Sequence, residues 1–198
     1  MRNNLTVIYV TGLNDSNPSF QKFAVKSWRL YGVDPVFFQS EWASNETFQD
    51  KLKRLTDVID QKIKEGSRVT LFAVSAGASL AVAAYAERNY ISSAAFVCGK
   101  LHRPEAVGEN YYQQNPAFRG AMERLYTNVA KLNKAEKSNI ISITPLFDEI
   151  VAVADARLKG AKNVILPTLF HTLTIGLAIS IFSYVPIFFL KHRTKRVE

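Results

Sequence analysis

The segment that most constrains the fold is residues 68–90, where an apolar run passes directly into a row of small helix-forming residues. Residues 68–74 are rich in β-branched and aromatic side chains, which is typical of a buried strand. Residues 76–86 are mostly small, with no proline and a single glycine, which predicts a helix. The sequence therefore predicts a strand that turns abruptly into a helix at Ser75.

The residues around Ser75 are small, as an abrupt turn from strand to helix requires. Such a turn crowds the residues two positions before and after it, and Ala73 and Gly77 leave the necessary space. The turn would lift the Ser75 hydroxyl clear of the sheet at a helix N-terminus, where the helix dipole and free N–H groups favour negative charge. A second interpretation stays open on this motif alone: serine is a favoured N-cap residue, so Ser75 could simply cap the helix.

Residues 73–77, Ala-Val-Ser-Ala-Gly, resemble the nucleophile elbow of the α/β-hydrolase family, whose usual pattern is Gly-x-Ser-x-Gly. The chain departs from that pattern with Ala73 in place of the first glycine and Val74 in place of the frequent histidine. The resemblance is to small single-domain serine esterases and lipases. It implies that Ser75 is a catalytic nucleophile.

The rest of the chain alternates strands with helices. Strands are also predicted at residues 5–11, 36–38, 91–98, 139–144 and 163–166, and helices at 20–31, 45–65, 118–132 and 150–158. This alternation predicts one α/β domain over residues 1–198, a three-layer sandwich whose mostly parallel sheet has helices on both faces, as in the compact α/β-hydrolase fold. Residues 99–137 break the alternation and are interpreted as an insertion, either a lid or a pocket wall.

A serine nucleophile needs a base, and the base needs an orienting carboxylate. In α/β hydrolases the chain order is serine, acid, histidine. His171 directly follows the last predicted strand, where the base of the family belongs. His102 comes before the strand expected to carry the acid, and His192 lies in a basic tail. The resemblance therefore implies His171 as the catalytic base.

The acid is expected just after the carboxyl end of the penultimate strand, where catalytic loops collect in parallel sheets. Asp148 lies there and is the preferred candidate, with Glu149 second and Asp155 expected on the following helix.

The oxyanion of an acyl-transfer intermediate needs two N–H donors. By resemblance these are the backbone groups of Ala76, after the nucleophile, and Leu13, in the loop after the first strand. Gly12 would let backbone and substrate approach closely. The loop could equally be an ordinary strand-to-helix turn.

A carboxylic ester is the expected substrate by resemblance, with a small-molecule ester as the partner. Lys100, His102 and Arg103 lie near the carboxyl end of a strand and could bind an anionic group, or they could be solvated loop charges. Tyr111 and its neighbours could line an apolar pocket, or they could pack the insertion against the core. The weak candidates for substrate binding are thus Gly12, Lys100, His102 and Tyr111.

Composition excludes several other classes of function. The formal net charge of +8 comes from basic residues spread along the chain, without the aromatic-interleaved basic patch that favours nucleic-acid binding. The single cysteine, Cys98, allows no intrachain disulfide and is interpreted as buried filler. No zinc spacing, phosphate loop or dinucleotide fingerprint is present, so neither a metal nor an organic cofactor is expected. Without a signal-peptide pattern, the expected location is cytoplasmic.

Residues 173–190 contain no charged side chain and precede a basic tail. As one helix they would be about 27 Å long, close to the hydrocarbon thickness of roughly 30 Å. Pro186 weakens a spanning helix, and the family's last helix covers one face of the sheet. A covering helix is therefore expected, with peripheral membrane contact or a homodimer contact through residues 187–190 left open. The alternative function is a non-catalytic or membrane-associated binding protein with a hydrolase-like fold.

Overall fold

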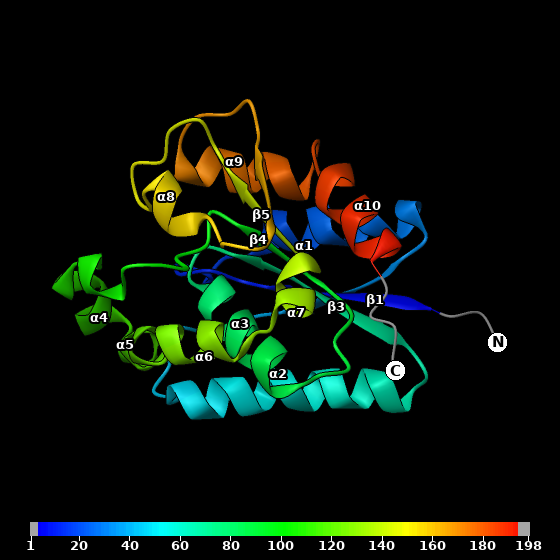
Figure 1. The fold of residues 1–198 in the computed structure, drawn as a ribbon, viewed down its shortest axis with the longest axis horizontal. Coiled ribbons are helices and arrows are strands. Elements are labelled where there is room, and N and C mark those ends of the chain that lie inside the picture. The colour runs from blue at the N-terminus through cyan, green and yellow to red at the C-terminus, as the bar shows by residue number, and fades with distance from the viewer. Residues whose placement is uncertain (1–3, 194–198) are drawn as a thin grey trace.

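The computed structural model describes residues 4–193, which form a sheet of six strands with helices on both faces (Figure 1). All neighbouring strands in the order β2-β1-β3-β4-β5-β6 pair in parallel. The strands are β1 (Leu5–Val10), β2 (Asp34–Phe38), β3 (Arg68–Val74), β4 (Ala94–Val97), β5 (Ile140–Thr144) and β6 (Lys162–Ile165). The predicted three-layer α/β class is confirmed.

The central strands alternate their side chains between two hydrophobic cores, one on each side of the sheet. In β1, Ile8 and Val10 belong to one core, whereas Val7 and Tyr9 belong to the other. All four are fully buried, because a central parallel strand is covered on both faces. This explains the unbroken apolar runs of the sequence.

The first helical layer contains α2 (Phe48–Lys64) and α3 (Gly77–Glu87) and lies below the sheet in Figure 1. Helix α2 begins with a capping box, in which the Thr47 side chain accepts from the Asp50 N–H and the Asp50 carboxylate accepts from the Thr47 N–H. Leu52, Leu55 and Ile59 lie on its buried face. The predicted amphipathic helix over 45–65 is therefore present, three residues shorter at its start.

The insertion adds several short helices to this layer: a 3₁₀ turn (Pro104–Ala106), α4 (Glu109–Gln114), α5 (Pro116–Glu123), α6 (Leu125–Lys131) and α7 (Lys134–Ser138). Helix α4 had no counterpart among the predicted helices, because its six residues are too few to show an apolar period. The single helix predicted over 118–132 is divided at Arg124. Phe118, Met122 and Leu125 are buried in the core below the sheet.

The second layer lies above the sheet and contains α1 (Ser19–Ser27), a 3₁₀ turn (Trp28–Tyr31), α8 (Val153–Ala156), α9 (His171–Ile179) and α10 (Tyr184–His192) (Figure 1). The Trp28 indole donates to the carbonyl of Ile179 at 2.9 Å and ties the 3₁₀ turn to α9. Strand β4 and helix α8 are shorter than the predicted 91–98 and 150–158.

The uncharged C-terminal stretch covers the sheet as two helices instead of one. Helices α9 and α10 meet at an angle of 59°, and within residues 4–193 no single helix has the length and apolarity to cross a bilayer; only this bent pair passes such a test. The break lies at residues 180–183, where the Ser180 backbone leaves the helical conformation. The Ser180 hydroxyl donates to the Gly176 carbonyl of α9, and the Ser183 hydroxyl donates to the Ser180 carbonyl. The end of the predicted basic tail, residues 194–198, lies outside the described residues.

Candidate active site

Ser75 occupies the turn between β3 and α3 in a strained backbone conformation. Its φ angle is 50°, in the left-handed region that serine rarely adopts. Its N–H donates to the carbonyl of Val97 at 2.9 Å, and its carbonyl accepts from Ala78 at 3.1 Å. Hydrogen bonds on both sides therefore hold the strained residue in place.

Close backbone contacts explain why the residues around this turn are small. A Cβ atom on Gly77 would lie 2.5 Å from the carbonyl oxygen of Thr11, and one on Gly12 would lie 2.8 Å from the Ser75 Cβ. Ala73 is fully buried in β3 between Val10 and Phe96 of the neighbouring strands. The turn thus brings the loop after β1 against Ser75.

The Ser75 side chain does not cap the helix. The N-cap of α3 is Ala76, without a side-chain cap hydrogen bond, and the Ser75 Oγ lies 2.9 Å from the Nε2 atom of His171. The interpretation of Ser75 as a simple capping residue is wrong.

His171 is the first residue of α9, directly after the loop that follows β6. Its backbone N–H donates to the Glu149 carboxylate at 2.9 Å, and its ring is buried. The Nδ1 atom lies 2.9 Å from Oδ2 and 3.1 Å from Oδ1 of Asp148. Both ring nitrogens are therefore occupied, one by Ser75 and the other by Asp148.

Asp148 is fixed by the loop after β5. Its Oδ1 accepts from the N–H groups of Ile150 at 2.9 Å and Val151 at 2.8 Å. Burial acts to raise the pKa of Asp148, but hydrogen bonds from His171 and these two N–H groups outweigh it and hold the pKa below its usual value. Asp148 thus stays an anion facing the imidazole. The structure brings Ser75, His171 and Asp148 into one hydrogen-bonded series, and Glu149 binds backbone instead of the ring.

The two N–H groups expected to bind an oxyanion are free to donate. Within the described part of the chain, the backbone N–H groups of Leu13 and Ala76 form no hydrogen bond with protein. Both residues line the same cavity as Ser75. Unpartnered N–H groups beside a nucleophile are suited to a developing negative charge.

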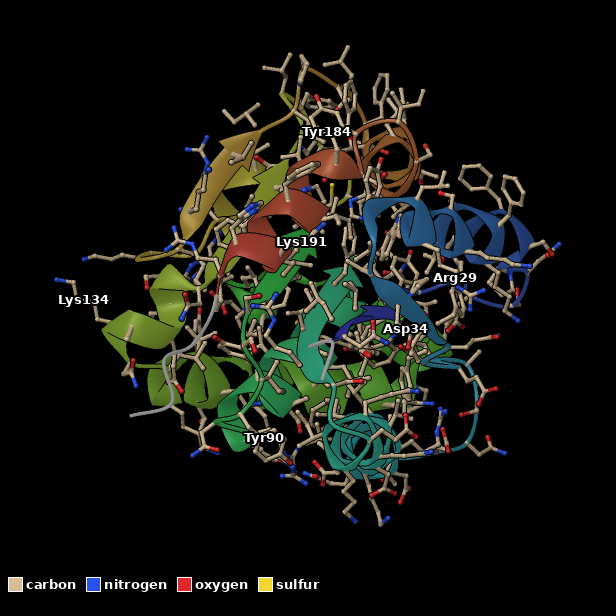
Figure 2. The ribbon with its side chains drawn as sticks, turned by 90° about the vertical axis from the view of Figure 1, so that its right-hand side faces the viewer. Arg29, Asp34, Tyr90, Lys134, Tyr184 and Lys191 are labelled. Atoms are coloured by element: carbon tan, nitrogen blue, oxygen red, sulfur yellow. The ribbon has the colours of Figure 1, made fainter. Side chains whose placement is uncertain are left out.

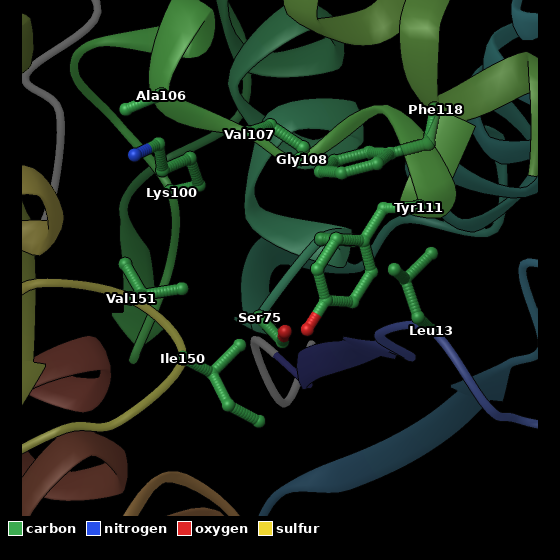
Figure 3. A pocket seen from close by; sticks show the side chains of 11 residues that line it. Leu13, Ser75, Lys100, Ala106, Val107, Gly108, Tyr111, Phe118, Ile150 and Val151 are labelled. Carbon is green, nitrogen blue, oxygen red and sulfur yellow. The ribbon is translucent and has the colours of Figure 1, made fainter. Parts of the chain in front are cut away.

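Ser75 lies between two adjoining cavities. Figure 3 shows the smaller one, with Tyr111 projecting from α4 toward Ser75 and Ile150 on the other side. Its volume is about 70 Å³, and its apolar wall includes Val107, Phe118 and Val151. The larger cavity, of about 260 Å³, is lined by Gly12, Gln21, His171, Thr172 and Ile175, among others. A substrate with two arms could therefore place its reacting centre at Ser75.

The remaining candidate residues are placed differently. Lys100 lines the smaller cavity, but its Nζ donates to Asp155 Oδ2 at 2.6 Å. Arg103, mostly exposed, donates to the other oxygen of Asp155 at 2.5 Å. The His102 ring lines neither cavity beside Ser75. The basic cluster is therefore an ion-pair network around Asp155, a contact that sequence reasoning missed because its members are more than 50 positions apart.

Cys98 lies beside Asp148 and His171. Its sulfur and ligand atoms of Asp148 and His171 lie within 4.8 Å of one another, the one group of this metal-ligand type in residues 4–193. Burial, together with the nearby Asp148, raises the pKa of the Cys98 thiol. A thiol kept neutral, next to a histidine and a carboxylate that already bind each other, is a poor ligand set for zinc.

Comparisons with known proteins agree with this architecture. No protein-family model and no curated protein match the chain. Among solved structures, the α/β hydrolase GrgF from Penicillium sp. sh18 matches with a TM-score of 0.69 at 12% identity, covering 98% of this chain and 91% of its own.

Two esterase or lipase structures are similarly related. One, from work on the metagenome-derived lipolytic enzymes LipS and LipT, has a TM-score of 0.68 at 10% identity and covers 96% and 95% of the two chains. Est1E from Butyrivibrio proteoclasticus has a TM-score of 0.63 at 17% identity and covers 93% and 88%. The chain thus has the α/β-hydrolase fold.

Proposed function

We propose that this protein is a serine hydrolase that cleaves carboxylic esters through an acyl-enzyme. The observation that carries the proposal is the hydrogen-bonded series Ser75–His171–Asp148, with distances of 2.9 Å at both junctions. A hydroxyl, an imidazole and a carboxylate in this order are the parts that nucleophilic acyl transfer needs. The esterases and lipases among the structural neighbours support the reaction class by fold analogy.

In the first half-reaction, the Ser75 Oγ attacks the ester carbonyl carbon while His171 Nε2 takes the hydroxyl proton. The carbonyl π electrons move to oxygen, and the N–H groups of Leu13 and Ala76 stabilise the resulting oxyanion. When the intermediate collapses, the bond from the carbonyl carbon to the alkoxy oxygen breaks, and His171 gives its proton to the departing alcohol.

In the second half-reaction, water replaces the alcohol. His171 takes a proton from water as the hydroxide adds to the acyl carbon, and the bond to Ser75 Oγ then breaks with return of the proton to serine. Asp148 remains ionised throughout, because its lowered pKa favours the carboxylate, and it orients the imidazole and stabilises its charged form.

The two cavities support an ester with two unequal arms. We assign the acyl arm to the smaller cavity, whose volume of about 70 Å³ suits a short chain. The larger cavity between α1 and α9 takes the alcohol arm. Tyr111 lines both and is placed to contact the substrate on either side of the reacting carbon. Gly12 leaves the backbone close to Ser75, as the proposal requires.

The test is steady-state hydrolysis of p-nitrophenyl esters from acetate to octanoate. Ser75→Ala should reduce kcat/KM by at least about 10⁴-fold, because the nucleophile is lost. Ser79→Ala is the matched control, since Ser79 lies in α3 four residues after Ser75 and its hydroxyl donates to the Ala76 carbonyl. Equal rates for Ser75→Ala and wild type would contradict the proposal, and absent turnover in folded wild type would favour a non-catalytic binding protein.

A further inference from the structure

One side of the molecule exposes an unusual amount of apolar surface. Six large side chains, each at least half exposed, define what we term the apolar face: Phe20, Phe23, Phe147, Phe170, Leu173 and Ile181. They come from α1, the loops after β5 and β6, α9 and the turn that ends α9. Single exposed apolar residues are ordinary on a protein surface, but a contiguous set indicates a contact.

Contacts place several of these segments side by side. The Phe147 and Phe170 rings meet edge to face at 6.2 Å, and the Phe170 N–H donates to the Phe147 carbonyl at 2.9 Å. The Phe20 ring lies 3.9 Å from the position that a Cβ atom on Gly176 would take, so α1 lies against α9. Phe147 therefore lies against Phe170, and α1 lies against α9, so the segments that carry the apolar face are neighbours.

Helix α9 and the segments on either side of it lack the charges that solvent-facing helices normally have, whereas α1 carries Lys22 and Lys26. Residues 163–190 contain no Asp, Glu, Lys or Arg. On the opposite layer, the exposed face of α2 carries the ion pairs Lys53–Asp57 and Lys62–Glu65. Figure 2 shows the contrast, with mostly carbon sticks around Tyr184 at the top and nitrogen and oxygen tips around α2 at the bottom. Water solvates α2 well, whereas the apolar face would gain by leaving water.

Two of the helices that carry the apolar face also line the candidate active site. The larger cavity beside Ser75 is lined by Gln21 of α1 and by Thr172 and Ile175 of α9. It therefore opens between the two helices that carry Phe20 and Leu173. A binding partner that covers the apolar face would therefore lie next to the larger cavity beside Ser75.

The positive charge near the apolar face favours an anionic lipid surface over a second copy of the chain as its binding partner. Lys26 and Arg29 line a groove on α1 together with Phe23, and the whole chain carries a net charge of +8. A second copy of the chain would bring these cations against equivalent cations, whereas anionic lipid headgroups would neutralise them. Apolar side chains bordered by cations are the pattern of proteins that insert shallowly into an anionic bilayer surface.

We propose that the apolar face docks on the surface of an anionic lipid bilayer, with α1 and α9 lying in the interface. Phe23 and Ile181, the two most exposed of the six, enter the headgroup boundary, and Lys26 and Arg29 contact lipid phosphates. The entrance between α1 and α9 then faces the membrane.

The test is flotation with vesicles of equal parts phosphatidylcholine and phosphatidylglycerol, compared with phosphatidylcholine alone. The wild type should float with the anionic vesicles and bind the neutral ones more weakly. The double variant Phe23→Glu with Ile181→Glu should bind about a hundredfold more weakly, about tenfold for each apolar side chain lost. Tyr126→Glu is the control and should bind as wild type, because Tyr126 is a half-exposed aromatic on α6 of the opposite layer.

Two outcomes would overturn the proposal. In one, folded wild-type protein stays at the bottom of the gradient with both anionic and neutral vesicles, or the double variant floats as well as the wild type. In the other, sedimentation velocity finds a wild-type dimer that the two glutamates dissociate, so a second copy covers the face. Circular dichroism checks that every variant is folded. The assay requires no turnover, so its result is independent of whether the chain hydrolyses esters.

Discussion

Asp148 and Asp155 lie on the same connection between β5 and β6, and both are buried carboxylates with charged or polar partners. In both, burial acts to raise the pKa, but hydrogen bonds outweigh it and the pKa lies below its usual value. Their partners differ. Asp148 faces the ring of His171, which is bonded in turn to Ser75, whereas Asp155 binds Lys100 and Arg103, which carry permanent charge.

The partners of the two carboxylates indicate that Asp148 can take part in catalysis, whereas Asp155 stabilises the fold. A lowered pKa alone does not identify a functional site, because ion-pair networks produce the same shift. A carboxylate whose partner is an imidazole bonded to a nucleophile is a candidate catalytic group. The two positions therefore make a natural pair of variants.

The largest expected difference is in activity. Asp148→Asn should lower kcat/KM for a short p-nitrophenyl ester by about 10⁴-fold, because the amide no longer favours the productive tautomer or stabilises the charged imidazole. Asp155→Asn should change it by less than about tenfold, since Asp155 contacts neither Ser75 nor His171. Comparable losses in both variants would mean that Asp155 acts in the reaction as well.

For the free energy of unfolding, we expect the larger effect from Asp155→Asn and the smaller one from Asp148→Asn. Asp155→Asn leaves the buried Lys100 ammonium with a neutral partner and should lower the free energy of unfolding by about 3 kcal/mol. Asp148→Asn should cost about 1 kcal/mol, because the amide oxygen can still accept from Ile150 and Val151. Urea titration followed by circular dichroism measures both, and a more stable Asp155→Asn variant would contradict the structural role.

Most of the fold could be predicted from the sequence, but the different partners of Asp148 and Asp155 could be predicted only in part. The strand-to-helix turn at Ser75 is encoded locally by small residues, and the parallel sheet by alternating apolar runs. Asp148 and His171 were reached through the chain order of the family that the turn resembles. The Lys100–Asp155 pair has no local signal, because a tertiary contact alone joins the two residues.

Other differences between the predicted and the observed structure arise within single short segments. Helix α4 is too short to show an apolar period, and the break between α9 and α10 lies at Ser180, whose backbone leaves the helical conformation without a proline or glycine to signal it. Cys98, interpreted as filler, is buried as expected, and it lies beside Asp148 with a left-handed backbone, at a φ of 51°.

Acid unfolding gives a smaller effect with a defined sign. A carboxyl group whose pKa is lower in the folded state stabilises the fold above its unfolded pKa, near 3.9, and this stability is lost as the pH falls through the folded value. The free energy of unfolding of the wild type should therefore decrease below about pH 4. The decrease should be shallower in Asp155→Asn, as measured by urea midpoints at successive pH values. An identical slope in both proteins would mean that Asp155 has the same pKa folded and unfolded.

The smallest expected effect comes from removing the second network altogether. Lys100→Met combined with Asp155→Leu replaces the buried ion pair with apolar side chains and leaves exposed Arg103 to solvent. The free energy of unfolding should stay within about 1 kcal/mol of wild type, unlike that of Asp155→Asn alone. Urea titration of the double variant beside Lys100→Met and Asp155→Leu measures the coupling, and a loss equal to the sum of the two single losses would contradict the expectation, because additivity means that the two side chains do not interact.

The most direct test of the account is labelling with a fluorophosphonate probe, followed by intact-mass analysis and peptide mapping. The probe forms a covalent bond only with an activated serine and requires no knowledge of the substrate. The account predicts a single adduct on Ser75, absent from Ser75→Ala and strongly reduced in His171→Ala. Folded wild-type protein without an adduct, or with the adduct on another serine, would contradict the assignment of Ser75 as the nucleophile.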